Sequence, residues 1–335
     1  MPLLLGLVLV GGCRHNSSQP RHTSLRIAVG GQTQLVYLPL TLAQQLGYYQ
    51  QEGLDVQITD LAGGAKALEA LLSGSVDVVC GYFDHVIQMR AEGKKLTAFL
   101  LMQRFPGLAL VVSPATARQI HRVEDLSGAV VGVSAPGSST SFFLRYLLHQ
   151  VGMDAAQLAE TGIGMGASAI AAMQFGKVDA AVLAEPAISI LARRKGPLRI
   201  LADTRTEQGA RAVYGSSYYP AAVLYSHQNW LKENGPIARA VARALLRTLQ
   251  WMQNHSPEEI ARAMPETFRG EDLTLYIETV RSALPMFEPS GRMPRDGPAR
   301  VRQLLSLLLD KVGQATIDEA ETFSDEWLPQ PFASP

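Results

Sequence analysis

The chain has 335 residues, 47% of them hydrophobic, and its 30 basic and 30 acidic residues give a formal net charge of zero at pH 7. This length exceeds that of a typical single core and predicts two domains of ordinary size. The balanced charge, without a long run of one sign, argues against nucleic acid or an anionic membrane surface as a partner.

The first 23 residues differ in composition from the rest. An apolar run at 3–10 is followed by two glycines, Cys13 and a polar tract up to residue 23. The run is too short to span a bilayer. This order resembles a bacterial lipoprotein signal and tether, which implies export and a membrane anchor through lipidated Cys13. No Lys or Arg precedes Leu3, so an apolar N-terminus with an incidental cysteine remains the alternative.

Cys80 is the second of two cysteines and lies in the segment 76–80, which has the pattern of a buried strand. A single remaining cysteine supplies neither a disulfide framework nor a set of metal ligands. We therefore expect Cys80 to be a core residue, and we expect no metal or other cofactor.

From residue 25 onward, short β-branched runs alternate with helical segments, which is the pattern of an α/β protein with a parallel sheet. Helices are predicted at 39–50, 65–72 and 142–151. Strands are predicted at 25–30, 54–59, 76–80, 96–101, 108–113, 130–133, 159–163, 179–183, 198–203 and 221–226.

After residue 226 the pattern becomes entirely helical. Helices are predicted at 228–254, 256–264, 271–284 and 296–312, and we expect this region to pack against the α/β body. The closing segment 328–335 is rich in proline and is expected to be a disordered tail.

No linker divides the chain, so the boundary between two lobes must be formed by strands that cross it. The apolar strands 108–113 and 220–226 are the candidates. They give a discontinuous first lobe, 24–111 plus 222–327, and an inserted second lobe, 112–221. We expect each lobe to hold a mostly parallel sheet flanked by helices.

Ligands of open parallel sheets bind outside the carboxyl ends of the strands. In the first lobe this rule selects Gln34, Tyr37, Gly63, Gly64, Ala65, Tyr82, Phe83 and Asp84. In the second lobe it selects Ser134, Pro136, Gly137, Ser138, Ser139, Thr140, Gly164, Gly166, Ala167, Ser168 and Glu185.

The turn at 134–140 is the strongest of these candidates, because small residues and a helix start expose N–H groups and a positive dipole end. With Gly63 and Gly64 it would hold an anionic or carbonyl-like head group. The alternative is that Ser138, Ser139 or Thr140 only caps its helix. Tyr37, Tyr82 and Phe83 would offer flat apolar surface to the body of the ligand.

Asp84 and Glu185 accept hydrogen bonds when ionised and would require a donor group on the ligand. Two acids beside an anion-binding turn disfavour a bare inorganic anion and favour a small organic solute with a donor group. The alternative, that each acid caps its helix, stays open.

Several segments, in this order and spacing, are similar to solute-binding proteins of ABC importers, the group of nitrate, sulfonate, taurine and thiamin-pyrimidine receptors. They lie at 38–40, 46–49, 52–56, 63–68, 72–78, 135–140, 178–182 and 185–187. The resemblance covers about residues 25–328. It implies a two-lobed, type II periplasmic-binding-protein fold that closes on its solute and delivers it to a permease and its ATPase. A periplasmic or outer-surface location and a monomer are expected.

Two other classes remain open beside the binding protein, for which we expect no catalytic residue. An enzyme on this fold, similar to the thiamin-pyrimidine synthases, would need a reactive His and a Cys-rich stretch, and Cys80 alone does not supply the latter. A sensory binding protein would normally continue into a transmembrane helix.

Overall fold

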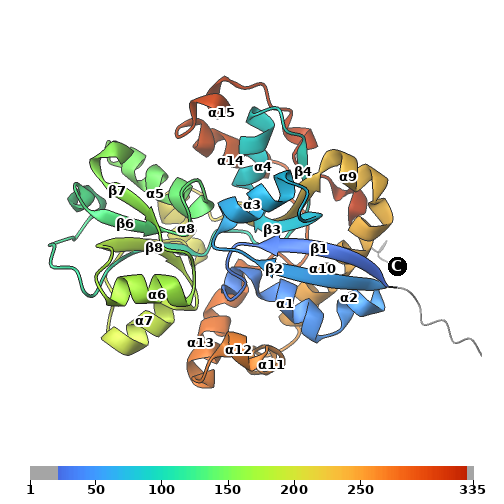
Figure 1. Ribbon diagram of the computed structural model, residues 1–335, viewed down its shortest axis with the longest axis horizontal. Helices are drawn as coiled ribbons and strands as arrows, with labels where there is room; N and C mark the ends of the chain where they lie inside the picture. Colours follow the sequence, from blue (N-terminus) through green and yellow to red (C-terminus); the bar gives the residue numbers. More distant parts are fainter. Residues whose placement is uncertain (1–21, 330–335) are drawn as a thin grey trace, which may run out of the picture.

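The computed structural model describes residues 22–329, so the predicted signal with Cys13 and the residues 330–335 lie outside the described part of the chain. Two five-stranded sheets, each flanked by helices, form two lobes (Figure 1). The chain begins in the first sheet, crosses to the second and returns to the first.

The first sheet has the strand order β2-β1-β3-β10-β4. Strand β1 pairs in parallel with β2 and β3, while β10 runs antiparallel between β3 and β4. The strands β1, β2, β3 and β4 therefore run in the same direction, opposite to β10. The strands are β1 (Thr23–Val29), β2 (Leu54–Asp60), β3 (Val78–Tyr82), β4 (Leu96–Leu101) and β10 (Ala222–His227).

The second sheet repeats this plan in the order β7-β6-β8-β5-β9. Strand β6 pairs in parallel with β7 and β8, and β5 runs antiparallel to β8 and β9. The expected α/β fold with two mostly parallel sheets is confirmed. The strands are β5 (Leu108–Val112), β6 (Val130–Val133), β7 (Ala159–Gly162), β8 (Ala180–Ala184) and β9 (Ile200–Asp203).

The antiparallel strand of each sheet, β5 or β10, is the one that follows a crossing between the lobes. The crossing segments lie side by side, since Tyr219 N donates to Arg104 O at 2.7 Å. The first crossing precedes the boundary placed at 111/112, because all of β5 pairs within the second sheet. The chain passes from the first lobe to the second at Pro106 and Gly107, and the positive φ of 68° at Gly107 suits glycine.

Helices cover the faces of both sheets. The first lobe has α1 (Leu38–Gln45), α2 (Tyr48–Gln51), α3 (Gly64–Leu72) and α4 (Asp84–Ala91). The predicted helix 39–50 is two helices because Gly47 adopts a left-handed conformation between them. The second lobe has α5 (Ser139–Gln150), α6 (Ala167–Gln174), α7 (Ala187–Lys195) and α8 (Glu207–Tyr214).

The C-terminal helices pack against the first lobe, as expected, with α10 beside α1 and α14 beside α4. The predicted helix 228–254 is divided near Pro236, which lacks an N–H group and starts a new helix in its first turn. The predicted helix 296–312 is also divided. The helices are α9 (Gln228–Glu233), α10 (Gly235–Gln253), α11 (Pro257–Ala263), α12 (Glu266–Arg269), α13 (Leu273–Ala283), α14 (Gly297–Ser306) and α15 (Asp310–Gln314).

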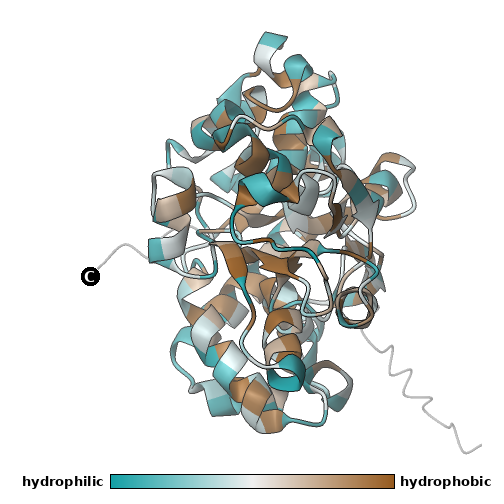
Figure 2. Cartoon of the chain, turned by 90° about the vertical axis from the view of Figure 1, so that its left-hand side faces the viewer, coloured by the Kyte–Doolittle hydropathy of each residue, from teal (hydrophilic) through white to brown (hydrophobic). Residues whose placement is uncertain are grey.

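The core lies along the central strands, and every residue of β3, β4, β5 and β8 is buried. Apolar residues concentrate on the strands, whereas the helices carry both polar and apolar residues (Figure 2). Cys80 is fully buried, as predicted, and burial raises the pKa of its thiol. Among the described residues, no helix has the length and apolarity needed to cross a membrane.

The substitution Leu245→Ala should lower the free energy of unfolding by about 2 to 5 kcal/mol, because it removes a fully buried side chain from α10 and leaves a cavity. The control is Phe175→Ala, whose side chain is 74% exposed, with an expected change within about 0.5 kcal/mol. Urea unfolding measures both. Equal effects of the two substitutions would contradict this packing.

Candidate functional site

A cavity lies between the two lobes, at the carboxyl ends of β1, β3, β6 and β8. From the first lobe it is lined by Gly30, Gln34, Val36, Tyr37, Gly64 and Tyr82. From the second lobe it is lined by Leu108, Ser134, Ser138, Ser139, Thr140, Met165 and Ala184. The structure thus brings eight of the predicted ligand-binding residues to one cavity: Gln34, Tyr37, Gly64, Tyr82, Ser134, Ser138, Ser139 and Thr140.

The cavity is small, about 20 Å³, which is room for about one water molecule. Direct hydrogen bonds join the lobes around it. They run from Leu35 N to Glu185 O at 2.8 Å, from Ala65 N to Ser138 Oγ at 3.1 Å and from Ser139 Oγ to Asp84 Oδ1 at 2.8 Å. The cleft is therefore closed, and an organic solute can enter it only if the lobes separate.

Two helix N-termini meet at this cavity, α3 from the first lobe and α5 from the second. Each presents the positive end of a helix dipole, which favours a negative or carbonyl-like group, although Ala65 N in the first turn of α3 already donates to Ser138 Oγ. Gly63 allows their close approach, because a Cβ atom there would lie 3.1 Å from Ser134 Oγ of the second lobe. Within the first lobe, a Cβ atom at Gly30 would lie 2.4 Å from the carbonyl carbon of Gly63, so glycine at 30 lets the start of α3 pack against the end of β1.

Gln34 is the clearest polar group without a partner at the cavity. Its side chain is 1% exposed, and both its amide oxygen and its amide nitrogen lack a hydrogen-bond partner among the described residues. Burying an unpaired donor or acceptor costs about 1 to 3 kcal/mol for each group. A ligand that offers both an acceptor and a donor to Gln34 would recover this free energy.

Asp84 lies in the first turn of α4 and is 6% exposed. Its carboxylate accepts a hydrogen bond from Ser139 Oγ across the cleft at 2.8 Å, in addition to the backbone N–H of His85 in its own helix. Burial raises the pKa of the Asp84 carboxyl, although His85 and Ser139 act in the opposite direction. Asp84 therefore links the lobes in the closed cleft.

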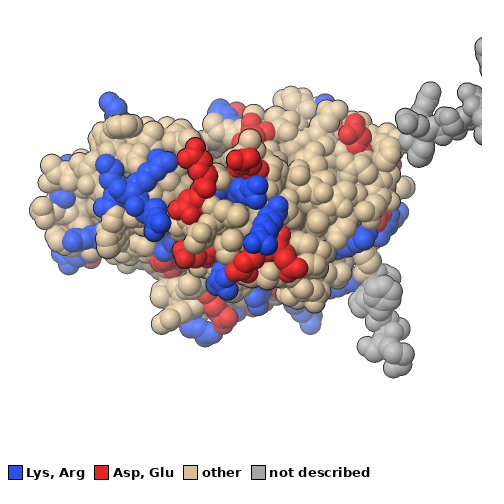
Figure 3. All heavy atoms as spheres, turned by 90° about the horizontal axis from the view of Figure 1, so that it is seen from below, with Lys and Arg blue, Asp and Glu red and all other residues tan. Residues whose placement is uncertain are grey.

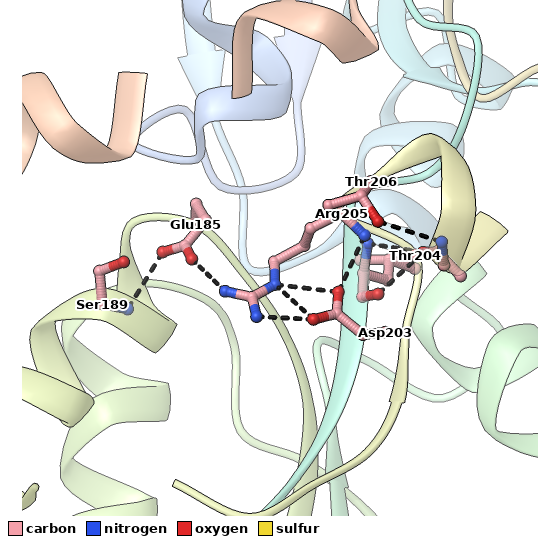
Figure 4. Close-up of polar contacts among 8 residues, drawn as sticks. Glu185, Ser189, Asp203, Thr204, Arg205 and Thr206 are labelled. Atoms are coloured by element: carbon pink, nitrogen blue, oxygen red, sulfur yellow. Dashed lines mark hydrogen bonds and ion pairs between the residues drawn. The ribbon is translucent and has the colours of Figure 1, made fainter. Parts of the chain in front are cut away.

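Glu185 has a different set of partners, shown in Figure 4. Its Oε2 accepts a hydrogen bond from Ser189 N at 3.1 Å, in the first turn of α7, so it does cap this helix. Its Oε1 accepts a hydrogen bond from Arg205 Nη1 at 2.5 Å. The same guanidinium donates to the carboxylate of Asp203, from Nε at 3.0 Å and from Nη2 at 2.7 Å. Glu185 is thus neutralised within the second lobe.

Arg205 was missed in the sequence although it follows β9 directly and the strand-end rule applies to it. It lines a second cavity of about 240 Å³, on the other side of Val36 from the first. The second lobe contributes Glu185, Ser189, Asp203, Arg205 and Thr206, and the first lobe contributes Leu35, Val36, Ser282, Ala283 and Met286. The boundary between the lobes therefore holds more space than the central cavity alone.

Other predicted residues lie away from the central cavity. Phe83 is fully buried in the core behind β3. Ser168 bonds the carbonyl oxygen of Met165 in its own loop, and Met165 lines the cavity instead. The remaining predicted residues outside the lining are Gly63, Ala65, Pro136, Gly137, Gly164, Gly166 and Ala167, in addition to Asp84 and Glu185 described above.

Asp84→Asn should reduce the pH dependence of stability. Burial raises the pKa of Asp84 above its usual 3.8, so below that value both folded and unfolded states hold the proton. As pH rises, the unfolded state ionises first, and the free energy of unfolding of the wild type falls through the folded pKa. The fall should be smaller in Asp84→Asn. Urea unfolding at several pH values, with exposed Asp55→Asn as control, measures this; equal slopes in all three proteins would contradict it.

Arg205→Met should lower the free energy of unfolding by about 3 kcal/mol, because it leaves Glu185, whose side chain is 10% exposed, as an unpaired buried acid. Arg300→Met is the control. Its pair with Asp296 is exposed, 43% and 60%, and should contribute at most about 0.5 kcal/mol. Thermal unfolding measures both, and a neutral Arg205→Met would show that Glu185 needs no cation.

Comparisons with known proteins agree with this architecture. The family described as NMT1/THI5 like matches residues 34–260, more than half of the chain. A solved structure of a Bordetella bronchiseptica RB50 protein is 34% identical, with a TM-score of 0.86 over 91% of this chain and 95% of that one. The alkanesulfonate-binding protein SsuA of Xanthomonas axonopodis pv. citri is 19% identical, with a TM-score of 0.72 over 90% and 98%.

Among curated relatives, the formylaminopyrimidine-binding protein of Halalkalibacterium halodurans is 24% identical over 77% of this chain and 76% of its own. A 4-amino-5-hydroxymethyl-2-methylpyrimidine phosphate synthase of Schizosaccharomyces pombe matches only 29% of this chain, at 31% identity. Among the curated relatives, those that match most of the chain are thus named as binding proteins, whereas the synthase matches a short part of it. This chain belongs to the NMT1/THI5 like family and has the two-lobed fold of the periplasmic solute-binding proteins.

Proposed function

We propose that this protein is the solute-binding component of an ABC importer. It captures a small organic solute between its lobes and delivers it, unchanged, to a membrane permease. The observation that carries this proposal is the central cavity, where the buried and unpaired amide of Gln34 faces a space at which two helix N-termini meet. A cavity with such unmet polar groups is suited to a ligand.

The groups around the cavity define the solute class. The N-termini of α3 and α5 suit an anionic or carbonyl-like head group, and the hydroxyls of Ser138, Ser139 and Thr140 add hydrogen bonds. Asp84, behind Ser139, makes a bare inorganic anion a poor fit. Relatives named for alkanesulfonates and a formylaminopyrimidine support sulfonate-like, taurine-like or pyrimidine-like solutes.

Binding then follows a cycle of opening and closing. The two crossing segments are the natural hinge, because only they connect the sheets within the described residues. Opening breaks the hydrogen bonds from Ala65 to Ser138 and from Ser139 to Asp84, and the solute takes over these partners. In the closed form the outer surfaces of the two lobes have a fixed position relative to each other, so a permease can distinguish this form from the open one.

The place of the protein follows from the same proposal. A receptor of an importer works outside the cytoplasmic membrane, and the fold of periplasmic relatives supports this location. Lipidation of Cys13 would tether the receptor near its permease. Figure 3 shows basic side chains grouped toward the left-hand end of one face and acidic side chains beside them in the middle, so neither sign covers this face as a whole. A lipid anchor, rather than a charged surface, would supply the membrane attachment.

Gln34→Ala should weaken retention of the solute about tenfold, because it removes hydrogen bonds worth about 1 to 1.5 kcal/mol. The measurement is native mass spectrometry of the full protein, in which a folded mass above the denatured mass reveals a co-purifying solute. Exposed Gln250→Ala is the matched control and should retain the solute as the wild type does.

The outcomes separate the functional classes. If unfolding releases the bound solute in its original chemical form, the result supports a binding protein. If it releases a chemically converted product, the result supports the enzyme alternative. The proposal is contradicted if the wild type carries no solute and its thermal stability responds to no sulfonate, carboxylate or pyrimidine. If Gln34→Ala retains the solute as well as the wild type does, Gln34 does not bind the solute.

A further inference from the structure

A separate cavity of about 140 Å³ lies at the edge of the boundary between the lobes. On one side it is bounded by the tyrosine cluster, which we define as Tyr146, Tyr214 and Tyr219. On the other side are Arg300 and Gln303 of α14 and Leu307, which directly follows this helix. It has no lining residue in common with the central cavity, and only a narrow cavity of about 10 Å³, lined by Ser139 and by Tyr219, lies between the two.

The tyrosine cluster favours a flat ligand. The rings of Tyr214 and Tyr219 stack with centroids 4.3 Å apart and planes 11° apart. Tyr146 continues the series against Tyr214, at 5.7 Å and 23°. Aromatic rings gain from such offset stacking beyond the apolar area they bury. Since an apolar cavity of about 150 Å³ binds benzene, the present volume is that of a single ring.

The polar groups around this cavity favour a neutral ligand with polar substituents. Arg300 is the only charged residue in the lining, and its Nε donates to Asp296 at 2.7 Å, which neutralises it. Ser216, Gln303 and the tyrosine hydroxyls supply both donors and acceptors. We propose that this cavity is a second binding site, for one neutral, planar aromatic molecule that bears a hydroxyl or carboxamide group.

Such a ligand would act on the closure of the cleft. Tyr146 and Tyr214 belong to α5 and α8 of the second lobe, whereas Gln303 belongs to α14, which packs on the first lobe, and Leu307 directly follows that helix. The cavity is complete only when the lobes are closed. A molecule held between its walls therefore favours the closed form, and the two sites are coupled reciprocally.

The test uses 4-hydroxybenzamide as probe and calorimetric titration of the full protein. We expect saturable binding of one molecule per chain. Cyclohexanecarboxamide, which carries the amide on a non-planar ring, should bind at least tenfold more weakly. The site is overturned if 4-hydroxybenzamide shows no saturable binding, or if both probes bind equally.

Variants locate the binding. Gln303→Trp fills the cavity from an exposed position of α14 and should weaken binding at least tenfold. Leu307→Trp, at a residue 51% exposed, gives a second blocked variant should the first not fold. Phe175→Ala removes a distant exposed aromatic ring and should leave binding unchanged. Binding that survives both tryptophan variants, or that is lost in Phe175→Ala, overturns the proposal. None of these outcomes depends on the nature of the imported solute.

Discussion

The closed cleft depends on the approach of two helix N-termini, α3 and α5, which meet through the hydrogen bond from Ala65 N to Ser138 Oγ. Two positive dipole ends repel each other unless a negative or carbonyl-like group lies between them. Glycine at 63 leaves no side chain between the start of α3 and Ser134 of the second lobe. The same contact thus holds the lobes together and favours a ligand that carries a negative or carbonyl-like group. The unpaired amide of Gln34 favours a ligand as well, because it lacks a hydrogen-bond partner among the described residues.

The fold supplies this approach through its connectivity. Each sheet receives one antiparallel strand, β5 or β10, immediately after a crossing, so the lobes are joined near the carboxyl ends of their parallel strands. Those ends carry the loops that line the cavity. The proposed rotation about the crossings would therefore move the loops of one lobe against those of the other and leave the buried central strands packed.

The sequence was sufficient for the fold class, for most strands and for the loop tips that meet at the cavity, because alternating elements and small-residue turns have local signals. Phe83 was predicted to face the ligand because the strand was expected to end at residue 80. The strand β3 instead ends at Tyr82, two residues later, and the side chain of Phe83 is buried in the core. The partner of Glu185 is Arg205, 20 residues away. Their contact depends on the order β8-β5-β9, which no local pattern reveals.

Lobe opening is tested most directly by pulsed electron paramagnetic resonance between spin labels at exposed positions on the two lobes, such as Lys66→Cys and Gln157→Cys. The protein that retains its solute is compared with the same protein after unfolding, dialysis and refolding. We expect a short distance between the labels with solute and a longer, broader distribution of distances without it. Identical distributions in the two preparations would contradict opening of the cleft as the route of binding.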